Sequence, residues 1–348
     1  MFLPVILVLS ISWALAIEKV IIDADPGVDD AVAILTTLGD PNVQVLGITC
    51  VRGNSNIKAT AVNALNTISV SGMKIKPKVV AGSDTGLLYT PPTNGWFGSD
   101  GFENLTLPNP PPKTDWIGIK PHSAAFIARH VKLYPGEITL ITIGPLTNVA
   151  IALHLNPNLL QQLKKIIVLG GSISGNGNIV PGVEFNFYMD PNAARFLLDQ
   201  AHSSGTVLTL IPLETIASHD LTQTWRWNTL AKIQNPAVDF LNKIEGAQQQ
   251  KHPQTVYTPH DTFATAVLLS SKFVTKTQKL YGFVENKSNK TSGALVVDYF
   301  NLTGNQANLE VVTDVSNDVI KQLMFDNLSN LVYKAGANVS EYTDYTET

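Results

Sequence analysis

The feature of the sequence with the clearest chemistry is a set of four aspartates within eight residues. Asp23, Asp25, Asp29 and Asp30 surround the turn signal Pro26-Gly27. Carboxylates packed this closely repel one another, and burial raises their pKa values. A bound cation is the simplest way to keep them ionised, and a set of hard oxygen ligands favours Ca²⁺ or Mg²⁺ over Zn²⁺. The stretch therefore predicts a divalent cation site.

The residues on either side predict where the aspartates lie in the fold. Residues 20–22 are apolar and β-branched, which is typical of a buried strand. Residues 31–38 are good helix formers and end at Gly39, a residue that commonly follows a helix. The acids thus lie where a strand passes into a helix, which in an open parallel sheet is the edge that binds ligands.

The spacing of the aspartates predicts different tasks for them. Asp23 and Asp25 share one face of the strand because the side-chain period of a strand is two. Asp29 and Asp30 are adjacent at the start of the helix and are predicted to point apart. One of that pair is then free to hold a metal while the other faces a substrate.

Strands and helices alternate along the rest of the chain. The predicted strands cover residues 43–51, 79–81, 138–143, 166–169 and 207–211, and shorter antiparallel strands are expected within residues 280–312. The predicted helices cover residues 56–69, 123–133, 147–155, 190–199, 260–271 and 318–334, and residues 225–250 are predicted to be a helical region with weak periodicity. This alternation predicts an α/β fold with an open, mostly parallel central sheet and helices on both faces. Residues 82–121 form a long loop, of a kind that is usually functional or disordered.

The two ends of the chain predict an exported protein with one domain. Residues 1–16 are typical of a signal peptide, with a short apolar core and a small-x-small cleavage site at residues 14–16, although no Lys or Arg precedes the core. No later apolar run reaches the roughly 18 residues of a membrane span, so the mature protein is expected to be secreted and soluble. Residues 17–338 are expected to form a single domain, and residues 339–348 a disordered tail.

Composition adds to this prediction. Cys50 is the only cysteine and lies in an apolar strand, so it is predicted to be a buried free thiol rather than part of a disulfide. The net charge is −4, and no basic block suggests binding to a nucleic-acid polymer. Six N-x-S/T triplets agree with export and glycosylation. They begin at Asn104, Asn286, Asn289, Asn301, Asn327 and Asn338.

Further polar residues stand at other predicted strand and helix ends, and each has an ordinary structural explanation. Asn54 and Thr147 suit turns or helix N-caps. Residues 170–178 are rich in glycine but lack a phosphate-binding signature. Glu184 and Asn186 alternate with phenylalanines, so an extended segment would place both on one side. The pair at 260–261 suits a cap beside a surface histidine.

Taken together, these stretches resemble one enzyme family. D-x-D-P-G-x-D-D-A after an apolar strand is similar to the signature of the nucleoside hydrolases, the calcium-dependent enzymes that cleave the N-glycosidic bond of nucleosides. Gly53-Asn54, the 144–150 segment, the E-F-N segment 184–186 and His260-Asp261 follow in family order. The resemblance extends from residue 23 to about residue 298.

The resemblance implies a role for each matched residue. Calcium would be bound by Asp25, Asp30, Asp261 and the backbone carbonyl of Thr147. Asp25 would also act as the general base toward a calcium-bound water, and His260 would protonate the leaving base, a role that suits imidazole. The residues implied to contact the ribose hydroxyls are Asp29, Asn54, Asn178, Glu184 and Asn186. Asp23 is expected to support the site from behind.

The implied function is a secreted nucleosidase that converts a ribonucleoside to free nucleobase and ribose, working as a homodimer or tetramer. One departure concerns the long loop, where the family often has H-G-x-D-G and this chain has Phe97 in place of the histidine. Trp96, Trp225 and Trp227 could stack on the base, although core packing or a surface position explains each of them better. Tyr257 is a somewhat better candidate.

Three other functions compete with this prediction. A haloacid-dehalogenase-type phosphohydrolase also opens with D-x-D, but it needs Thr or Val where this chain has Gly27. An EF-hand loop needs an acid at its twelfth position, which here is Ile34. An inert secreted nucleoside-binding protein would keep the fold and the site without turnover.

Overall fold

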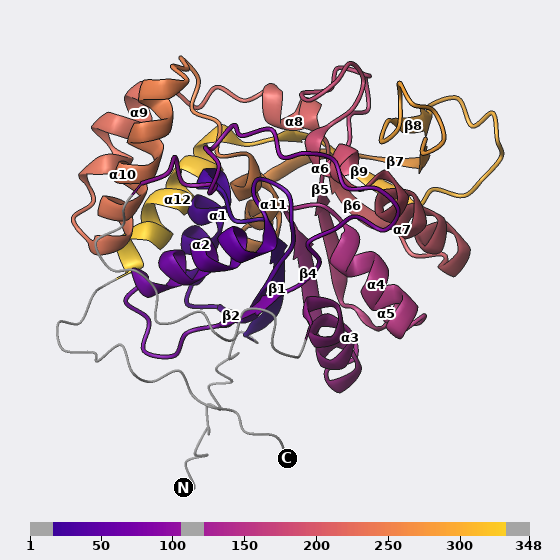
Figure 1. Ribbon diagram of the computed structural model, residues 1–348, viewed down its shortest axis with the longest axis horizontal. Coiled ribbons are helices and arrows are strands. Elements are labelled where there is room, and N and C mark those ends of the chain that lie inside the picture. Colours follow the sequence, from indigo (N-terminus) through magenta and orange to yellow (C-terminus); the bar gives the residue numbers. More distant parts are fainter. Residues whose placement is uncertain (1–16, 106–121, 332–348) are drawn as a thin grey trace, which may run out of the picture.

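Nine strands form one sheet in the computed structural model, which describes residues 17–105 and 122–331 (Figure 1). The order across the sheet is β3-β2-β1-β4-β5-β6-β9-β7-β8. The strands are β1 (Glu18–Ala24), β2 (Val43–Cys50), β3 (Lys78–Ala81), β4 (Ile138–Thr142), β5 (Lys165–Leu169), β6 (Leu208–Ile211), β7 (Val274–Val284), β8 (Leu295–Asp298) and β9 (Leu309–Val315). Neighbours from β3 to β9 are parallel, and β7 runs antiparallel to both β9 and β8.

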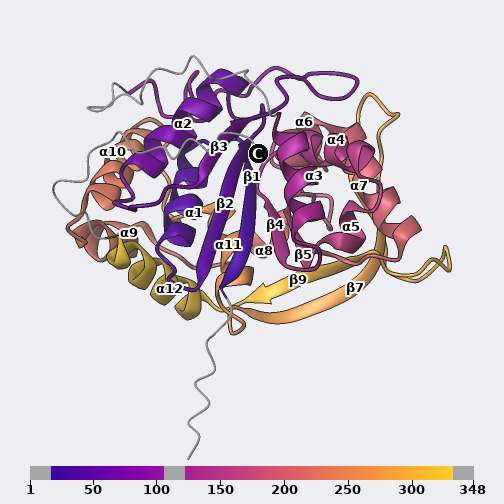
Figure 2. The same ribbon diagram turned by 90° about the horizontal axis from the view of Figure 1, so that it is seen from below.

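Helices cover both faces of the sheet (Figures 1 and 2). One face carries α1 (Val28–Leu38), α2 (Ile57–Ser69), α10 (Pro236–Lys251), α11 (His260–Leu269) and α12 (Asn317–Asn330). The other carries α3 (Ser123–Leu133), α4 (Thr147–Leu155), α5 (Leu159–Gln162) and α7 (Pro191–Ser204). The predicted fold class, an open and mostly parallel sheet between two helical layers, is therefore confirmed.

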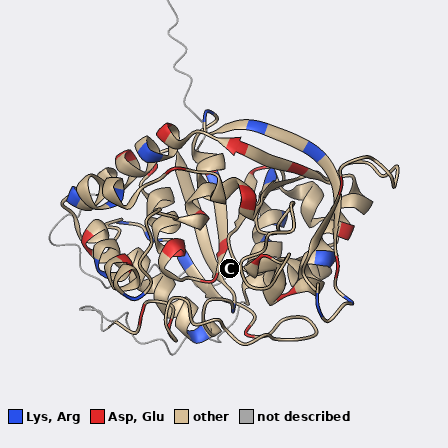
Figure 3. Cartoon of the chain, turned by 90° about the horizontal axis from the view of Figure 1, so that it is seen from above, with Lys and Arg blue, Asp and Glu red and all other residues tan. Residues whose placement is uncertain are grey.

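The alternation of the strands explains why there are two cores. Val20 and Ile22 of β1 pack into the core beside α1, while Ile21 between them packs into the core beside α3 and α4. All three are fully buried, as expected for a strand that is covered on both sides. Lys and Arg of the described residues are spread over several elements (Figure 3).

The helical region predicted at residues 225–250 is present and consists of separate helices. The structure has α9 (Gln223–Asn228), a 3-10 turn at Leu230–Lys232 and then α10. Pro236 lacks the backbone N–H that an uninterrupted helix would use, and Asn235 accepts a hydrogen bond from the N–H of Val238 as the N-cap of α10. The antiparallel strands expected within 280–312 are present, but β9 also extends the parallel sheet beside β6.

Some predictions lie outside the described residues. These are the signal peptide at 1–16, part of the long loop at 106–121, and the tail at 339–348 with Asn338. Residues 82–105 form neither a helix nor a strand. Within the part of the chain that the structure describes, every helix is too short or too polar to span a bilayer.

The parallel strands bring five connecting segments to one edge of the sheet. The last residues of β1 are aligned with both neighbouring strands, since Ala24 pairs with Cys50 of β2 and Asp23 pairs with Thr142 of β4. The segments that follow β1, β2, β4, β5 and β6 therefore emerge together, and they carry most of the polar residues singled out above.

Candidate active site

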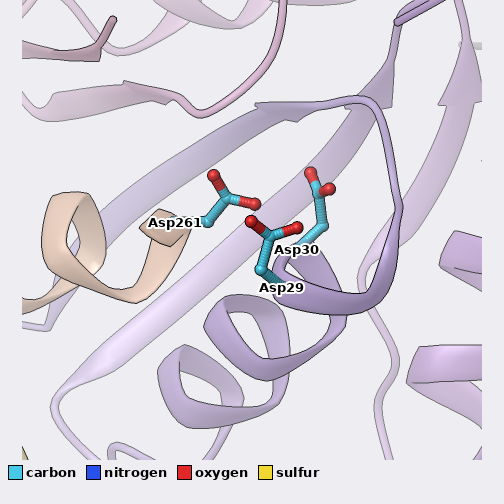
Figure 4. Close-up of side chains that lie close together, drawn as sticks. All are labelled: Asp29, Asp30 and Asp261. Atoms are coloured by element: carbon cyan, nitrogen blue, oxygen red, sulfur yellow. The ribbon is translucent and has the colours of Figure 1, made fainter. Parts of the chain in front are cut away.

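Three carboxylates from two helices meet at this edge. Asp29 and Asp30 lie in the first turn of α1, and Asp261 lies in the first turn of α11. One oxygen of each lies within 4.8 Å of the other two, and Figure 4 shows the three side chains pointing toward a common space. Because α1 and α11 pack side by side, the acidic turn and the 260–261 segment become neighbours.

The prediction that Asp29 and Asp30 point apart is wrong. Each places an oxygen in the same group as Asp261, although Asp30 is fully buried and the Asp29 side chain keeps 14% of its surface exposed. The sequence argument treated the helix start in isolation, whereas α11 packs over it and supplies the third carboxylate to both. Asp29 is therefore placed to reach a metal as well as a substrate.

Two oxygens of this group lack a hydrogen-bond partner among the described residues. They are Oδ1 of Asp29 and Oδ1 of Asp30, and both are shielded from solvent. Buried polar atoms in folded proteins almost always have a partner, so carboxylate oxygens without one are suited to bind a cation. Three carboxylates with hard oxygen donors suit Ca²⁺ or Mg²⁺. The residues present therefore fit a divalent metal.

The pKa values in the cluster show why it needs a positive charge. Burial, followed by the charge of Asp30, raises the pKa of Asp25 well above its ordinary value. Burial and the charge of Asp29 do the same for the pKa values of Asp30 and Asp261. Without a cation the protein therefore favours protonated carboxyl groups here, and a metal would compete with those protons.

Asp25 is enclosed by the connections after β2 and β4. Its Oδ2 accepts a hydrogen bond of 2.6 Å from the backbone N–H of Asn54. A Cβ atom on Gly53 would lie 2.0 Å from Oδ2 of Asp25, and one on Gly144 would lie 2.6 Å from its Oδ1. Any residue other than glycine at these two positions would displace the carboxylate. Asp25 lies outside the 4.8 Å group, but its charge acts on Asp261.

Asn54 connects the acids rather than capping a helix. Its Nδ2 donates to the backbone carbonyl of Asp25 and to Oδ2 of Asp30, each at 3.2 Å. The N-cap of α2 is instead Asn56, whose side chain accepts from the N–H of Ala59. The simpler explanation of Asn54 as a cap is therefore wrong, and its amide lies at the cluster.

Asp23 is bound by side chains from β2 and α4. Its Oδ1 accepts hydrogen bonds from Thr49 Oγ1 at 2.5 Å and from Asn148 Nδ2 at 2.9 Å. Burial raises the pKa of Asp23 to about 7, although both hydrogen bonds act against that shift. Asn148 was missed as a contributor, and its place beside Thr147 in the 144–150 segment was the available signal.

Thr147 is buried as the first residue of α4, and Leu146 occupies the N-cap position. Its hydroxyl donates to Oδ2 of Asp190 at 2.7 Å. Asp190 is in turn the N-cap of α7 and accepts from the N–H of Ala193. The side chain of Thr147 thus links α4 to α7, which leaves its backbone carbonyl as the group that the resemblance assigns to a metal.

The segment at Glu184 and Asn186 is helical, so the extended form considered for it is wrong. Residues Phe185–Met189 form α6, and the Glu184 carboxylate caps it by accepting from the N–H groups of Asn186 and Phe187. It also accepts from the N–H of Gly171 at 2.8 Å. Burial nevertheless raises the pKa of Glu184 to about 7. The alternation of polar and aromatic residues favoured an extended segment, so the sequence did not predict this helix cap.

Asn178 and Asn186 are held in different ways. The buried Asn186 side chain donates from Nδ2 to the carbonyls of Ile143 and Leu169, each at 3.2 Å, at the ends of β4 and β5. Asn178 is exposed, and its Oδ1 accepts from the N–H of Phe185 at 2.9 Å. Both therefore belong to the same edge of the sheet as the acids.

His260 lies at the rim of the cluster. It is the first residue of α11, and its Nδ1 lies 3.5 Å from Oδ2 of Asp29. Its side chain is 38% exposed, which leaves the ring accessible from solvent. The structure thus places a titratable imidazole directly beside the carboxylate group.

The aromatic candidates for a base contact are mostly engaged elsewhere. Phe97 is buried over the turn, since a Cβ on Gly27 would lie 2.7 Å from its ring. Trp96 stacks on His252 with ring centroids 4.4 Å apart. Tyr257 is 5% exposed, and the guanidinium of Arg226 lies 5.9 Å from the centroid of its ring.

Comparisons with known proteins agree with this arrangement. The family model described as inosine-uridine preferring nucleoside hydrolase matches residues 20–322. An uncharacterised protein of Schizosaccharomyces pombe is 34% identical over 90% of this chain and 99% of its own length. The pyrimidine-specific ribonucleoside hydrolase RihB of Escherichia coli is 29% identical over 86% of this chain and 94% of its own. A solved inosine-guanosine nucleoside hydrolase, 27% identical, superposes with a TM-score of 0.82 over 90% of this chain and 99% of that one.

Proposed function

Because the chain belongs to the inosine-uridine preferring nucleoside hydrolase family, and is thus a hydrolase of ribonucleosides, we propose that it releases free nucleobase and ribose at the acid cluster as a secreted, calcium-dependent enzyme. The observation that carries the proposal is the meeting of Asp29, Asp30 and Asp261. Two of these have a buried oxygen with no hydrogen-bond partner among the described residues. Fold and family support the reaction, and the cluster supports its location.

The proposed metal ligands are Asp25, Asp30, Asp261 and the Thr147 carbonyl, and the geometry adds Asp29 as a further candidate. When bound, a divalent ion of this kind orients a water molecule and lowers its pKa. The hard donor set supports calcium or magnesium, and the family resemblance favours calcium. Asn54 holds Asp25 and Asp30 in place through its amide groups.

Asp25 is the proposed general base. Its carboxylate is clamped between Gly53 and Gly144, so its position does not depend on a flexible rotamer. The backbone N–H of Asn54 also holds this carboxylate, and a carboxylate held in one position can accept a proton from a water molecule beside it. A proton taken from the attacking water would therefore pass to Asp25 while the sugar carbon becomes oxocarbenium-like.

The proposed sugar contacts are supplied by Asp29, Asn54, Asn178, Glu184 and Asn186, which lie on the connections after β1, β2 and β5. Glu184 and Asn186 are locked by backbone hydrogen bonds, so they would meet the ribose without reorganising. His260, beside Asp29, is the proposed donor of a proton to the departing base.

The proposal is tested with inosine, guanosine, adenosine, uridine and cytidine, each assayed for free base with calcium and with a chelator. Turnover of at least one nucleoside is expected, and the chelator should remove it. Magnesium added after chelation distinguishes the two hard ions. Binding of nucleosides without release of base would instead support an inert binding protein, and release of phosphate from nucleotides would support a phosphohydrolase.

Secretion is proposed from residues 1–16 and from the sequons, of which all but Asn338 lie in the described residues. Asn289 and Asn301 are exposed, whereas Asn327 lies in α12 with 6% of its surface exposed. A glycan on Asn327 would block the packing of that helix. In a eukaryotic secretory host we therefore expect glycosidase-sensitive mass at Asn289 and Asn301 and none at Asn327.

The measurement compares electrophoretic mobility of secreted Asn289→Gln, Asn301→Gln and Asn327→Gln variants. The first two changes should each increase mobility, and the third should not. Retention of the whole protein inside the cell would contradict the proposed signal peptide. We also propose a homodimer or homotetramer, following the family resemblance, and light scattering on the mature chain should give a mass that is two or four times the monomer.

A further inference from the structure

A second histidine lies at the same edge of the sheet and has no part in the mechanism above. His219 follows α8 (Leu213–Ala217), in the connection that leaves β6. Its ring packs on Phe263 of α11 with centroids 5.0 Å apart, and Phe263 is itself fixed against Phe273. His219 therefore packs against α11, the helix that carries His260 and Asp261. The ring that it contacts, Phe263, is buried, as is Phe273 behind it.

A backbone hydrogen bond fixes the tautomer of His219. Its Nδ1 accepts from the N–H of Leu221 at 3.0 Å. A nitrogen that accepts a hydrogen bond carries no hydrogen of its own, so in the neutral ring the hydrogen lies on Nε2. The loop thus holds His219 as an Nε2–H donor.

The surroundings also keep the ring neutral. Burial, followed by the charge of His260, lowers the pKa of His219 to about 4. The His219 ring is therefore neutral near neutral pH. His260, by contrast, lies beside the carboxylate of Asp29. A neutral donor of fixed direction can orient a ligand without exchanging a proton with it.

The Nε2–H group of His219 is available to a small molecule. It has no hydrogen-bond partner among the residues that the structure describes, and it is absent from the polar atoms there that are both shielded and unpaired. The residue as a whole keeps 8% of its surface exposed. One face of the ring packs on Phe263, and Nδ1 is bonded to the N–H of Leu221. The part of the ring left open to solvent is therefore the edge that carries Nε2–H.

We propose that His219 is a specificity-determining residue that donates a hydrogen bond from Nε2 to an acceptor atom of the nucleobase, a carbonyl oxygen or an unprotonated ring nitrogen. The inference rests on the proposed function and assigns the base end of the same site. The acceptor becomes more electron-rich as the glycosidic electron pair moves onto the base, so the hydrogen bond strengthens along the reaction. His219 holds the base in one orientation, and His260 donates a proton to the departing base.

The test measures equilibrium binding, so it does not depend on turnover. Non-hydrolysable C-nucleoside isosteres of inosine and uridine, and ribose alone, are titrated by calorimetry into calcium-loaded wild-type protein and into His219→Leu and His219→Gln. Loss of the donor in His219→Leu should weaken binding of at least one isostere by about 10- to 100-fold, the usual effect of an unpaired polar group in a site. His219→Gln keeps an N–H donor and should recover most of that loss.

Ribose separates a base contact from a structural effect. It has no base, so all three proteins should bind it equally, and the calcium-induced rise in Tm should also be equal in all three. His154→Leu is the matched control, because His154 likewise packs on a phenylalanine, Phe196, at the end of α4. That change should leave every dissociation constant as in the wild type.

Several results would overturn the proposal. Unchanged binding of both isosteres by His219→Leu would do so, and so would an equal loss for ribose and isosteres, which would indicate a structural role. Wild-type protein that binds the isosteres but cleaves no nucleoside would contradict the proposed function. The His219 contact would still be supported if His219→Leu bound the isosteres more weakly. Normal turnover by the wild type, together with unchanged isostere binding by the His219 variants, would support the proposed function and contradict the His219 contact.

Discussion

Asp25→Asn is expected to lower kcat for inosine or uridine by about 10³-fold or more, since general-base catalysis alone typically contributes about 10²–10⁴-fold. Asparagine has the shape of aspartate, so it fits between Gly53 and Gly144, and its side-chain oxygen can still accept from the N–H of Asn54. The amide, however, cannot take a proton from water. The fold should persist while the chemistry is lost.

Steady-state kinetics with free-base detection, together with circular dichroism and thermal unfolding, measures this effect. Asp314→Asn is the matched control, because Asp314 is an exposed aspartate of β9, far along the sheet order from β1. It should change kcat by less than about 2-fold, as surface substitutions generally do. Retained turnover in a folded Asp25→Asn protein would remove Asp25 from the mechanism.

Removal of the metal is expected to destabilise the fold as well as to abolish activity. A ligand present at 100 times its dissociation constant stabilises the folded state by about 2.7 kcal/mol. Chelation should therefore lower Tm by about 5 °C, given the usual ratio of Tm shift to free energy. Differential scanning calorimetry with and without calcium measures the shift, and equal Tm values in both conditions would contradict a structural contribution from the metal.

The metal-free protein should also respond to pH in a defined direction. The folded-state pKa values of Asp25, Asp30 and Asp261 are raised, so between the unfolded pKa of about 3.9 and the raised values the folded state binds more protons than the unfolded state. Stability of the metal-free protein should thus fall as pH rises through that window. A bound divalent cation would remove this penalty, so the difference in Tm between the metal-free protein and the protein with added calcium should grow from pH 5 toward pH 7.

Asp30→Asn separates the two effects. It removes one of the buried charges, so the metal-free variant should unfold at a higher Tm than metal-free wild type at pH 7, with reduced dependence on pH. The same variant loses a ligand and should gain little from added calcium. Asp326→Asn, an exposed change in α12, is the control and should behave as wild type in both conditions. A metal-free Asp30→Asn protein less stable than wild type would show that repulsion in the cluster is not limiting.

The pattern of apolar and polar residues within single segments was sufficient to predict much of the architecture. The apolar residues 20–22 had to form a strand covered on both faces, and the alternation of strands and helices left a parallel sheet as the arrangement that buries them. The acidic turn could be located at the ligand-binding edge for the same reason, since a strand that runs into a helix ends there. Hard oxygen chemistry followed from the residue types alone.

Tertiary packing decided which of those residues act together. Nothing within residues 23–30 tells that α11 will cover the start of α1, so only the fold could bring Asp29 into the group with Asp261. The same is true of Glu184, whose alternating neighbours suggested an extended segment until Gly171 and the start of α6 supplied N–H donors for its buried carboxylate.

His219 is the clearest case of this division. In the sequence it is one histidine among seven, in a polar connection without a motif. Its tautomer depends on the N–H of Leu221 and its orientation on Phe263, which is distant in the chain. The sequence by itself therefore determined the kinds of groups present and the edge at which they gather, because these depend on residue type and on local periodicity. Their partners, protonation and direction were decided by the tertiary structure, because burial and contacts between distant segments set them.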